Sequence, residues 1–104
     1  FPIWLAPVQA VIIPITDRHL DYAQRVAERL REEGLRVEVD GRNERMNAKI
    51  RDAQLQKVPY MLVVGDREIE AGAAAVRTRT GEDLGAIPVG EVVDMLTKQV
   101  ADKS

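Results

Sequence analysis

Three short apolar segments alternate with two segments of helical periodicity, and this order restricts the chain to few folds. Residues 11–15, 35–39 and 60–64 are predicted strands, because they are apolar runs or alternate apolar with charged side chains. Residues 18–33 and 46–57 carry apolar side chains at helical spacing, opposite charged ones. Connections of this strand–helix–strand kind give parallel strands with right-handed crossovers. We therefore expect an α/β fold that begins with parallel strands.

Single residues mark where these elements should begin and end. Pro14 cannot donate to a strand ladder, so the first strand is predicted to end there. Thr16 and Asp17 are both suited to cap the first helix, and Gly34 is suited to end it. Asn43 follows a turn and is a candidate cap for the second helix.

The C-terminal part of the chain has a different pattern. Residues 65–68 are predicted to form a charged turn, residues 74–79 alternate as a strand does, and residues 84–87 are expected to pair briefly with the sheet. Apolar residues at helical spacing predict a final helix over 89–100. With 104 residues the chain suits one domain. The fold class that follows is α/β, a mixed sheet with about three helices.

Charge and composition exclude several classes of protein. The net charge of −2, from 15 basic and 17 acidic residues, is unlike that of proteins that coat nucleic acid non-specifically. The absence of cysteine excludes disulfides, thiol catalysis and cysteine-ligated metal sites, and it fits a reducing cytoplasm. No apolar run approaches the roughly 20 residues that span a membrane. We expect a cytoplasmic protein that does not interact with membranes.

Polar side chains follow each of the three predicted parallel strands. Ligands of open α/β sheets usually bind beyond the carboxyl ends of such strands, which here lead into residues 16–17, 40–43 and 65–68. Arginine offers a planar fork to a guanine edge, glutamate accepts from base amino groups, and asparagine does both. Unstacked bases of single-stranded RNA loops expose such edges. These residue types therefore suit base recognition, with side chains that converge beyond the sheet.

Basic residues near the second helix are candidates for holding RNA phosphates and setting the register of the loop. They are Arg42, Arg45, Lys49 and Arg51. The alternative is that they form only the solvated face of that helix, and the sequence leaves both possibilities open.

Five ordered motifs resemble the C-terminal anticodon-binding domain of threonyl-tRNA synthetases, which are class II aminoacyl-tRNA synthetases. They are residues 1–9 (FPIWLAPVQ), 39–46 (VDGRNERM), 49–54 (KIRDAQ), 59–68 (PYMLVVGDRE) and 76–79 (VRTR). The resemblance covers nearly the whole chain, while prolyl-, histidyl- and glycyl-tRNA synthetases share the fold and a looser pattern. It implies a mixed sheet of about five strands flanked by three helices.

The resemblance also implies a division of the chain and a reading task. Residues 1–9 would be the segment that leads in from a catalytic domain absent here, and residues 10–104 the anticodon-binding domain. Asn43, Glu68 and Arg77 would contact anticodon bases, reading the G and U that threonine anticodons share. The partner would be the anticodon loop of tRNA(Thr), so that the parent enzyme charges the correct tRNA.

Catalysis is not expected of this segment by itself. By the same resemblance, the parent enzyme would be a threonine–tRNA ligase and a homodimer, and the catalytic domain of the parent chain would be a second partner. ATP, Mg²⁺ and Zn²⁺ would be bound there, and no cofactor or metal is expected in this segment.

Simpler structural roles remain open for the three residues that would contact anticodon bases, here called the readers. Asn43 is a candidate helix cap, Glu68 lies in a charged turn where a solvated role is ordinary, and Arg77 is a candidate for a simple surface charge. His19, the only histidine, is expected to be solvated or to cap a helix.

Two other functions compete with RNA reading. Asp17, Asp40 and Asp66 end successive strands and would bind magnesium if the chain were a receiver-like or other small phosphoacceptor on a doubly wound sheet. Alternatively, the apolar residues 1–5 would pack against a partner protein, a role that is compatible with RNA binding.

Overall fold

The computed structural model describes residues 8–41 and 45–101. Its elements, in chain order, are β1 (Ala10–Pro14), the 3₁₀ turn η2 (Asp17–His19), α1 (Leu20–Glu32), β2 (Val37–Val39), α2 (Met46–Leu55), β3 (Tyr60–Val64), α3 (Asp66–Ala71), β4 (Ala73–Thr78), β5 (Asp83–Pro88) and α4 (Val89–Ala101). Each predicted strand and each predicted helix has a counterpart in this order.

The strands form one mixed sheet in the order β2-β1-β3-β4-β5. β1 runs parallel to both β2 and β3, as the crossover argument predicts. β4 is antiparallel to β3, and β5 is antiparallel to β4. The two antiparallel strands separate this fold from the doubly wound parallel sheet of the phosphoacceptor alternative.

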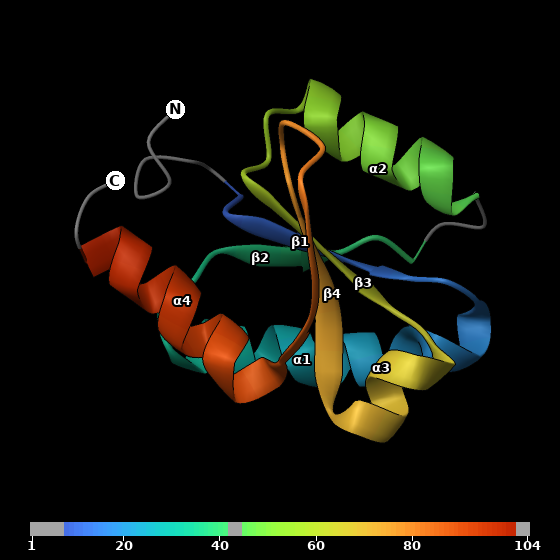
Figure 1. The fold of residues 1–104 in the computed structure, drawn as a ribbon, viewed down its shortest axis with the longest axis horizontal. Coiled ribbons are helices and arrows are strands. Elements are labelled where there is room, and N and C mark those ends of the chain that lie inside the picture. Colours follow the sequence, from blue (N-terminus) through green and yellow to red (C-terminus); the bar gives the residue numbers. More distant parts are fainter. Residues whose placement is uncertain (1–7, 42–44, 102–104) are drawn as a thin grey trace.

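Helices cover both faces of the sheet, because buried strands alternate their side chains between two cores. In β1, Ala10 and Ile12 join a cluster with α1 and α4, whereas Val11 and Ile13 join a cluster with α2. Figure 1 shows these layers, with α2 on one side of the sheet and α1 and α4 on the other. Within the described residues, α2 is the only long helix on its face of the sheet, so it covers that face only in part.

Several predicted boundaries are confirmed. β1 ends at Pro14, Thr16 is the N-cap of η2, and Gly34 takes a left-handed φ of 83° just after α1. The α2 helix begins at Met46, as its helical spacing predicts, and its N-cap position is Arg45 rather than the candidate Asn43.

The predicted turn over residues 65–68 is wrong, because a short helix, α3, begins at Asp66. Acidic residues in its first turn favour a helix N-terminus, and Gly72 ends the helix with a left-handed φ of 64°. No residue of α3 is buried, so the sequence carries no apolar periodicity from which the helix could be predicted. The sheet therefore carries four α-helices in the described part of the chain, one more than expected.

Candidate nucleic-acid interface

Glu68 lies on α3, just beyond the carboxyl end of β3. Its Oε1 atom lies 3.5 Å from the position that a Cβ atom would occupy on Gly65. Side chains two positions apart in extended backbone point to the same face of a sheet, and Val63 packs in the core with α2. A Cβ atom on Gly65 would therefore point to the face that α2 covers in part. The Glu68 carboxylate therefore lies at the carboxyl end of β3, next to the α2 face.

Arg77 lies on the same face but at the other end of β3. It pairs in register with Met61, and it follows Ala75 by two positions in β4; both of these residues contact the core under α2. Its guanidinium lies 3.9 Å from Asp83 on β5, and 37% of its side chain is exposed. The carboxylate of Asp83 is therefore near enough to attract the guanidinium, which remains partly exposed to solvent.

The two described readers lie at opposite ends of one strip of the sheet, on the face that α2 covers in part. The register places Gly65 and Arg77 four residues apart along β3 and β4, or about 13 Å at the usual rise of a strand. On this face Met61 and Val63 of β3 are buried in the core with α2, so the strip is accessible only over β4 and β5. There Ala75 is half-buried, and Ala86 opposite it on β5 is exposed. The expectation that all readers converge beyond the carboxyl edge is wrong for Arg77, because β4 returns antiparallel and carries it to the opposite edge.

Two predicted site residues, Arg42 and Asn43, lie outside the described residues, as do residues 1–5. Arg45 and Arg51 are exposed at the start and middle of α2. Their guanidinium groups are accessible from solvent, as phosphate contact requires.

Lys49 departs from the prediction that it contacts phosphate. Only 4% of it is exposed, and its ammonium donates to the carbonyl of Asp40 at 3.1 Å and to that of Pro14 at 3.5 Å. A buried ammonium without such acceptors would be costly. Lys49 therefore ties together the carboxyl ends of β1 and β2, and its ammonium is already engaged by backbone carbonyls.

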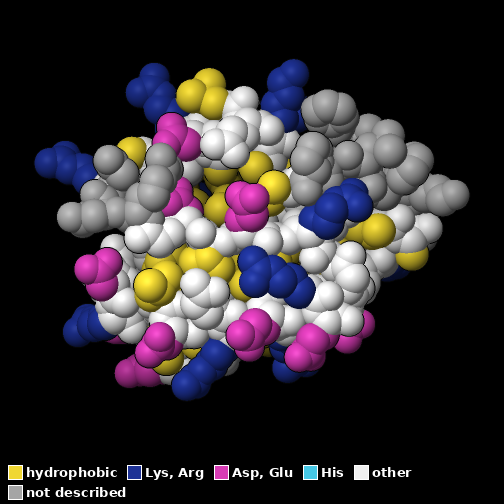
Figure 2. Space-filling view, turned by 180° about the vertical axis from the view of Figure 1, so that it is seen from behind, with side chains coloured by type: hydrophobic (Ala, Val, Ile, Leu, Met, Phe, Trp, Pro, Cys, Tyr) yellow, Lys and Arg dark blue, Asp and Glu magenta, His cyan; other side chains and the backbone are white. Residues whose placement is uncertain are grey.

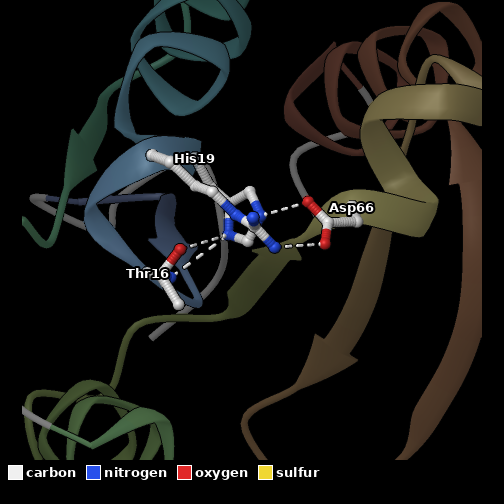
Figure 3. Close-up of polar contacts among 4 residues, drawn as sticks. Thr16, His19 and Asp66 are labelled. Carbon is white, nitrogen blue, oxygen red and sulfur yellow. Dashed lines mark hydrogen bonds and ion pairs between the residues drawn. The ribbon is translucent and has the colours of Figure 1, made fainter.

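His19 is buried, with 3% of the residue exposed, which corrects the expectation of a solvated histidine. The backbone N–H of Thr16 donates to Nδ1 at 3.2 Å, so Nδ1 is the unprotonated nitrogen. Nε2 then carries the proton and donates to Asp66 Oδ1 at 2.7 Å, while Arg18 donates to the other oxygen at 2.5 Å (Figure 3). The predicted capping role is confirmed, and a link from η2 to α3 is added to it.

These partners lower the pKa of Asp66 from its ordinary 3.8, chiefly through the hydrogen bond from His19. Desolvation opposes this effect, and the charge of Arg18 adds to the lowering. The unfolded chain therefore binds the proton at a higher pH than the folded one. It follows that the stabilisation by Asp66 is complete above about pH 3.8 and is lost as the pH falls through the folded pKa.

We expect Asp66→Asn to unfold more easily than the wild type at neutral pH, with a difference that shrinks toward zero in acid. Denaturant unfolding over a pH series measures this difference. Leu55→Ala, an exposed change without a titrating group, is the control, and its difference from the wild type should not vary with pH. A pH-independent difference for Asp66→Asn would contradict the assignment.

The acidic residues do not assemble into a metal site in the part of the chain that the structure describes. No group of three or more histidine, cysteine or acidic residues with suitable placement occurs there. Asp66 is engaged by Arg18 and His19, and Asp17 is exposed on η2. The magnesium alternative therefore finds no support in this arrangement.

A cavity of about 320 Å³ lies between α2 and the edge strand β2. Its lining includes Val11, Val39, Ala53, Glu38, Asp40 and Asp52. Figure 2 shows this side, where hydrophobic side chains lie in a hollow and acidic ones lie beside it. The lining also contains Lys49, so its three acidic residues outnumber one basic residue, and this balance disfavours RNA phosphates. The α2 helix separates this hollow from the strip between Glu68 and Arg77. The strip is therefore the better candidate for an RNA surface.

None of the helices among residues 8–41 and 45–101 is long and apolar enough to cross a membrane.

Comparison with known proteins agrees with this architecture. The family model described as "Anticodon binding domain" matches residues 9–99. A threonine–tRNA ligase from Desulforamulus reducens is 54% identical over 104 residues, which is 100% of this chain and 16% of that protein. The chain thus spans about a sixth of the length of this relative.

Solved structures repeat the fold. The RNA-binding domain of threonyl-tRNA synthetase from Cryptosporidium parvum matches with a TM-score of 0.89 and 29% identity, over 95% of this chain and 25% of that one. Prolyl-tRNA synthetase from Cryptosporidium parvum matches with a TM-score of 0.86 and 28% identity, over 98% of this chain and 22% of that one. From the match over residues 9–99 and this shared fold, we conclude that the chain belongs to the anticodon-binding domain family.

Proposed function

We propose that this chain reads the anticodon loop of a threonine tRNA on behalf of a larger threonine–tRNA ligase. The amino-acid assignment draws on the 54% identity to a threonine–tRNA ligase across the whole chain. In this proposal, residues 1–9 lead in from the catalytic part and residues 10–104 form the reading domain. The catalytic part would bind ATP, Mg²⁺ and Zn²⁺, and the parent enzyme would be a homodimer in the cytoplasm.

The observation that carries the proposal is the strip of sheet with Glu68 at one end and Arg77 at the other. An acceptor and a planar donor about 13 Å apart on one face of the sheet, beside half-buried Ala75 and exposed Ala86, suit two unstacked bases that lie along β4 and β5. No hydrogen bond or ion pair to the Glu68 carboxylate occurs among the described residues, so it is available to a base amino or imino group. Asn43 is proposed as the third reader.

We propose that Arg45 and Arg51, with Arg42 near them in the sequence, contact the phosphate backbone of the RNA. Because the chain is slightly acidic as a whole, few phosphates are engaged and binding depends weakly on salt. A slope of about −2 in log K against log salt corresponds to roughly three basic contacts on a single strand. A strongly basic RNA-coating protein would give a much steeper slope.

We expect the wild-type chain to bind a threonine-type stem-loop more tightly than variants with one anticodon base changed, by about 1–3 kcal/mol per base. Glu68→Gln removes the charge and half of the acceptor capacity, so it should relax discrimination at one base only. Filter binding with a panel of stem-loops measures both effects.

The matched control is Glu70→Gln, an exposed change of the same charge on the same helix, which should leave discrimination intact. Equal binding of matched and mismatched loops by the wild type would refute the proposed function. Discrimination that survives Glu68→Gln unchanged would refute the role of Glu68 alone.

A further inference from the structure

The helix that carries Glu68 is poorly held by packing. α3 has six residues, none of them buried, and it lies between the end of β3 and the start of β4. Helices this short are marginal in water without tertiary support. The position of α3 relative to the sheet therefore depends on polar links to the rest of the fold.

His19 supplies the first link. Its buried ring bridges the backbone N–H of Thr16, just after β1, to the carboxylate of Asp66, the first residue of α3. Figure 3 shows the ring between these two groups, with contacts on both of its nitrogens. His19 is 3% exposed, and the contacts on both of its ring nitrogens link η2 to α3.

Tyr22 supplies the second link, one turn further along α1. Its hydroxyl donates to the backbone carbonyl of Ala73 at 2.8 Å and approaches that of Glu68 at 3.4 Å. Burial, and after it the charge of Glu68, raises the pKa of the Tyr22 phenol, so the group remains a donor at neutral pH. Tyr22 thus contacts the backbone of the reader itself and the first residue of β4.

We propose that His19 and Tyr22 are positioning residues for base reading by Glu68. His19 holds Asp66 and Tyr22 holds the backbone carbonyl of Glu68, so α3 cannot shift easily relative to the sheet. The Glu68 carboxylate therefore stays beside Gly65 at the end of the strip. A side chain that selects a base by hydrogen bonds must be held close to one position. If the residues that support it let it move by about 1 Å, base discrimination falls although the domain still folds. This inference rests on the proposed role of Glu68 and adds to it the side chains that make it selective.

The chain offers substitutions that separate the two contacts of His19. In His19→Asn the amide lies where Nδ1 lies, so the Thr16 contact is kept and the Asp66 link is lost. In His19→Gln the amide nitrogen lies as many bonds from Cβ as Nε2 does, so the link to Asp66 is kept. We expect His19→Asn to lower discrimination at the base that Glu68 reads by about 3- to 10-fold, and His19→Gln to stay within about 2-fold of the wild type.

Tyr22→Phe tests the second link and is milder, because only a hydroxyl is removed. We expect a loss of discrimination of about 3-fold at the same base and none at the others. Tyr60→Phe is the matched control, since the Tyr60 hydroxyl donates to Gln99 at 2.6 Å, away from α3. Filter binding with the stem-loop panel gives the ratios, and thermal melting identifies variants that are fully folded at the assay temperature.

A merely structural role would lower the melting temperature and leave the base ratios of the folded fraction unchanged. Combining His19→Asn with Glu68→Gln adds a second criterion, because residues that act through one another are not additive. The double variant should discriminate no worse than Glu68→Gln alone.

The inference is overturned if Glu68→Gln relaxes discrimination while His19→Asn and Tyr22→Phe do not, or if the double variant loses the sum of both effects. If Glu68→Gln itself changes nothing, the role of Glu68 fails first and the positioning role fails with it.

Discussion

Arg77→Ala is expected to weaken binding of the matched stem-loop by about 1–3 kcal/mol and to relax the preference for one anticodon base. The guanidinium fork can donate to both acceptors on a guanine edge, which alanine cannot replace. The side chain is partly exposed on the α2 face, and the carboxylate of Asp83 lies 3.9 Å from its guanidinium. The loss should therefore appear in RNA selection and hardly in stability.

Two further variants make this result specific. Arg77→Lys keeps the charge but not the planar fork. Compared with Arg77→Ala, it should therefore recover more of the overall affinity than of the base preference. Arg25→Ala makes the same charge change on the exposed side of α1, across the sheet from the strip, and should leave binding unchanged. If Arg77→Ala weakened all loops equally, Arg77 would be a phosphate contact and its proposed reading role would be wrong.

Leu62→Ala is expected to lower the free energy of unfolding by about 2–5 kcal/mol. Leu62 is fully buried in β3, the central strand, where it packs in the core shared by α1 and α4. Removal of its side chain leaves a cavity that the surrounding strands close only in part. Chemical denaturation measures the change, which is a large share of the stability of a domain of this size.

Leu55→Ala is the matched control, because it is the same chemical change at a side chain that is 73% exposed on α2. It should change the free energy of unfolding by less than about 0.5 kcal/mol. Similar losses for the two variants would mean that Leu62 is not in a close-packed core.

Much of the fold was predictable because its information is local. The apolar run that ends at Pro14, the helical spacing that ends before Gly34 and the alternation that includes Arg77 each predict an element that the structure contains. Such patterns depend only on which side chains face a core. The helix α3 was missed for the same reason, since it buries no side chain and so leaves no periodic signal.

The candidate site was predictable only in its residue types. The sequence indicated Glu68 and Arg77 through a family resemblance and the chemistry of base edges. It did not indicate that His19 and Asp66, 47 positions apart, would meet, or that Lys49 would be buried against the backbone. A histidine followed by a regular helix gives no signal of a distant carboxylate.

By itself the sequence determined the order of the strands and helices along the chain except α3, and a slightly acidic composition that disfavours non-specific RNA binding. Only the tertiary structure decided that Glu68 and Arg77 share one face of the sheet at opposite ends, and that α3 is tied to η2 and α1. The physical reason is that apolar periodicity in the sequence shows which side chains face a core. It does not show which other strands and helices those side chains contact. Strand order and register, which bring distant side chains together, are properties of the assembled sheet.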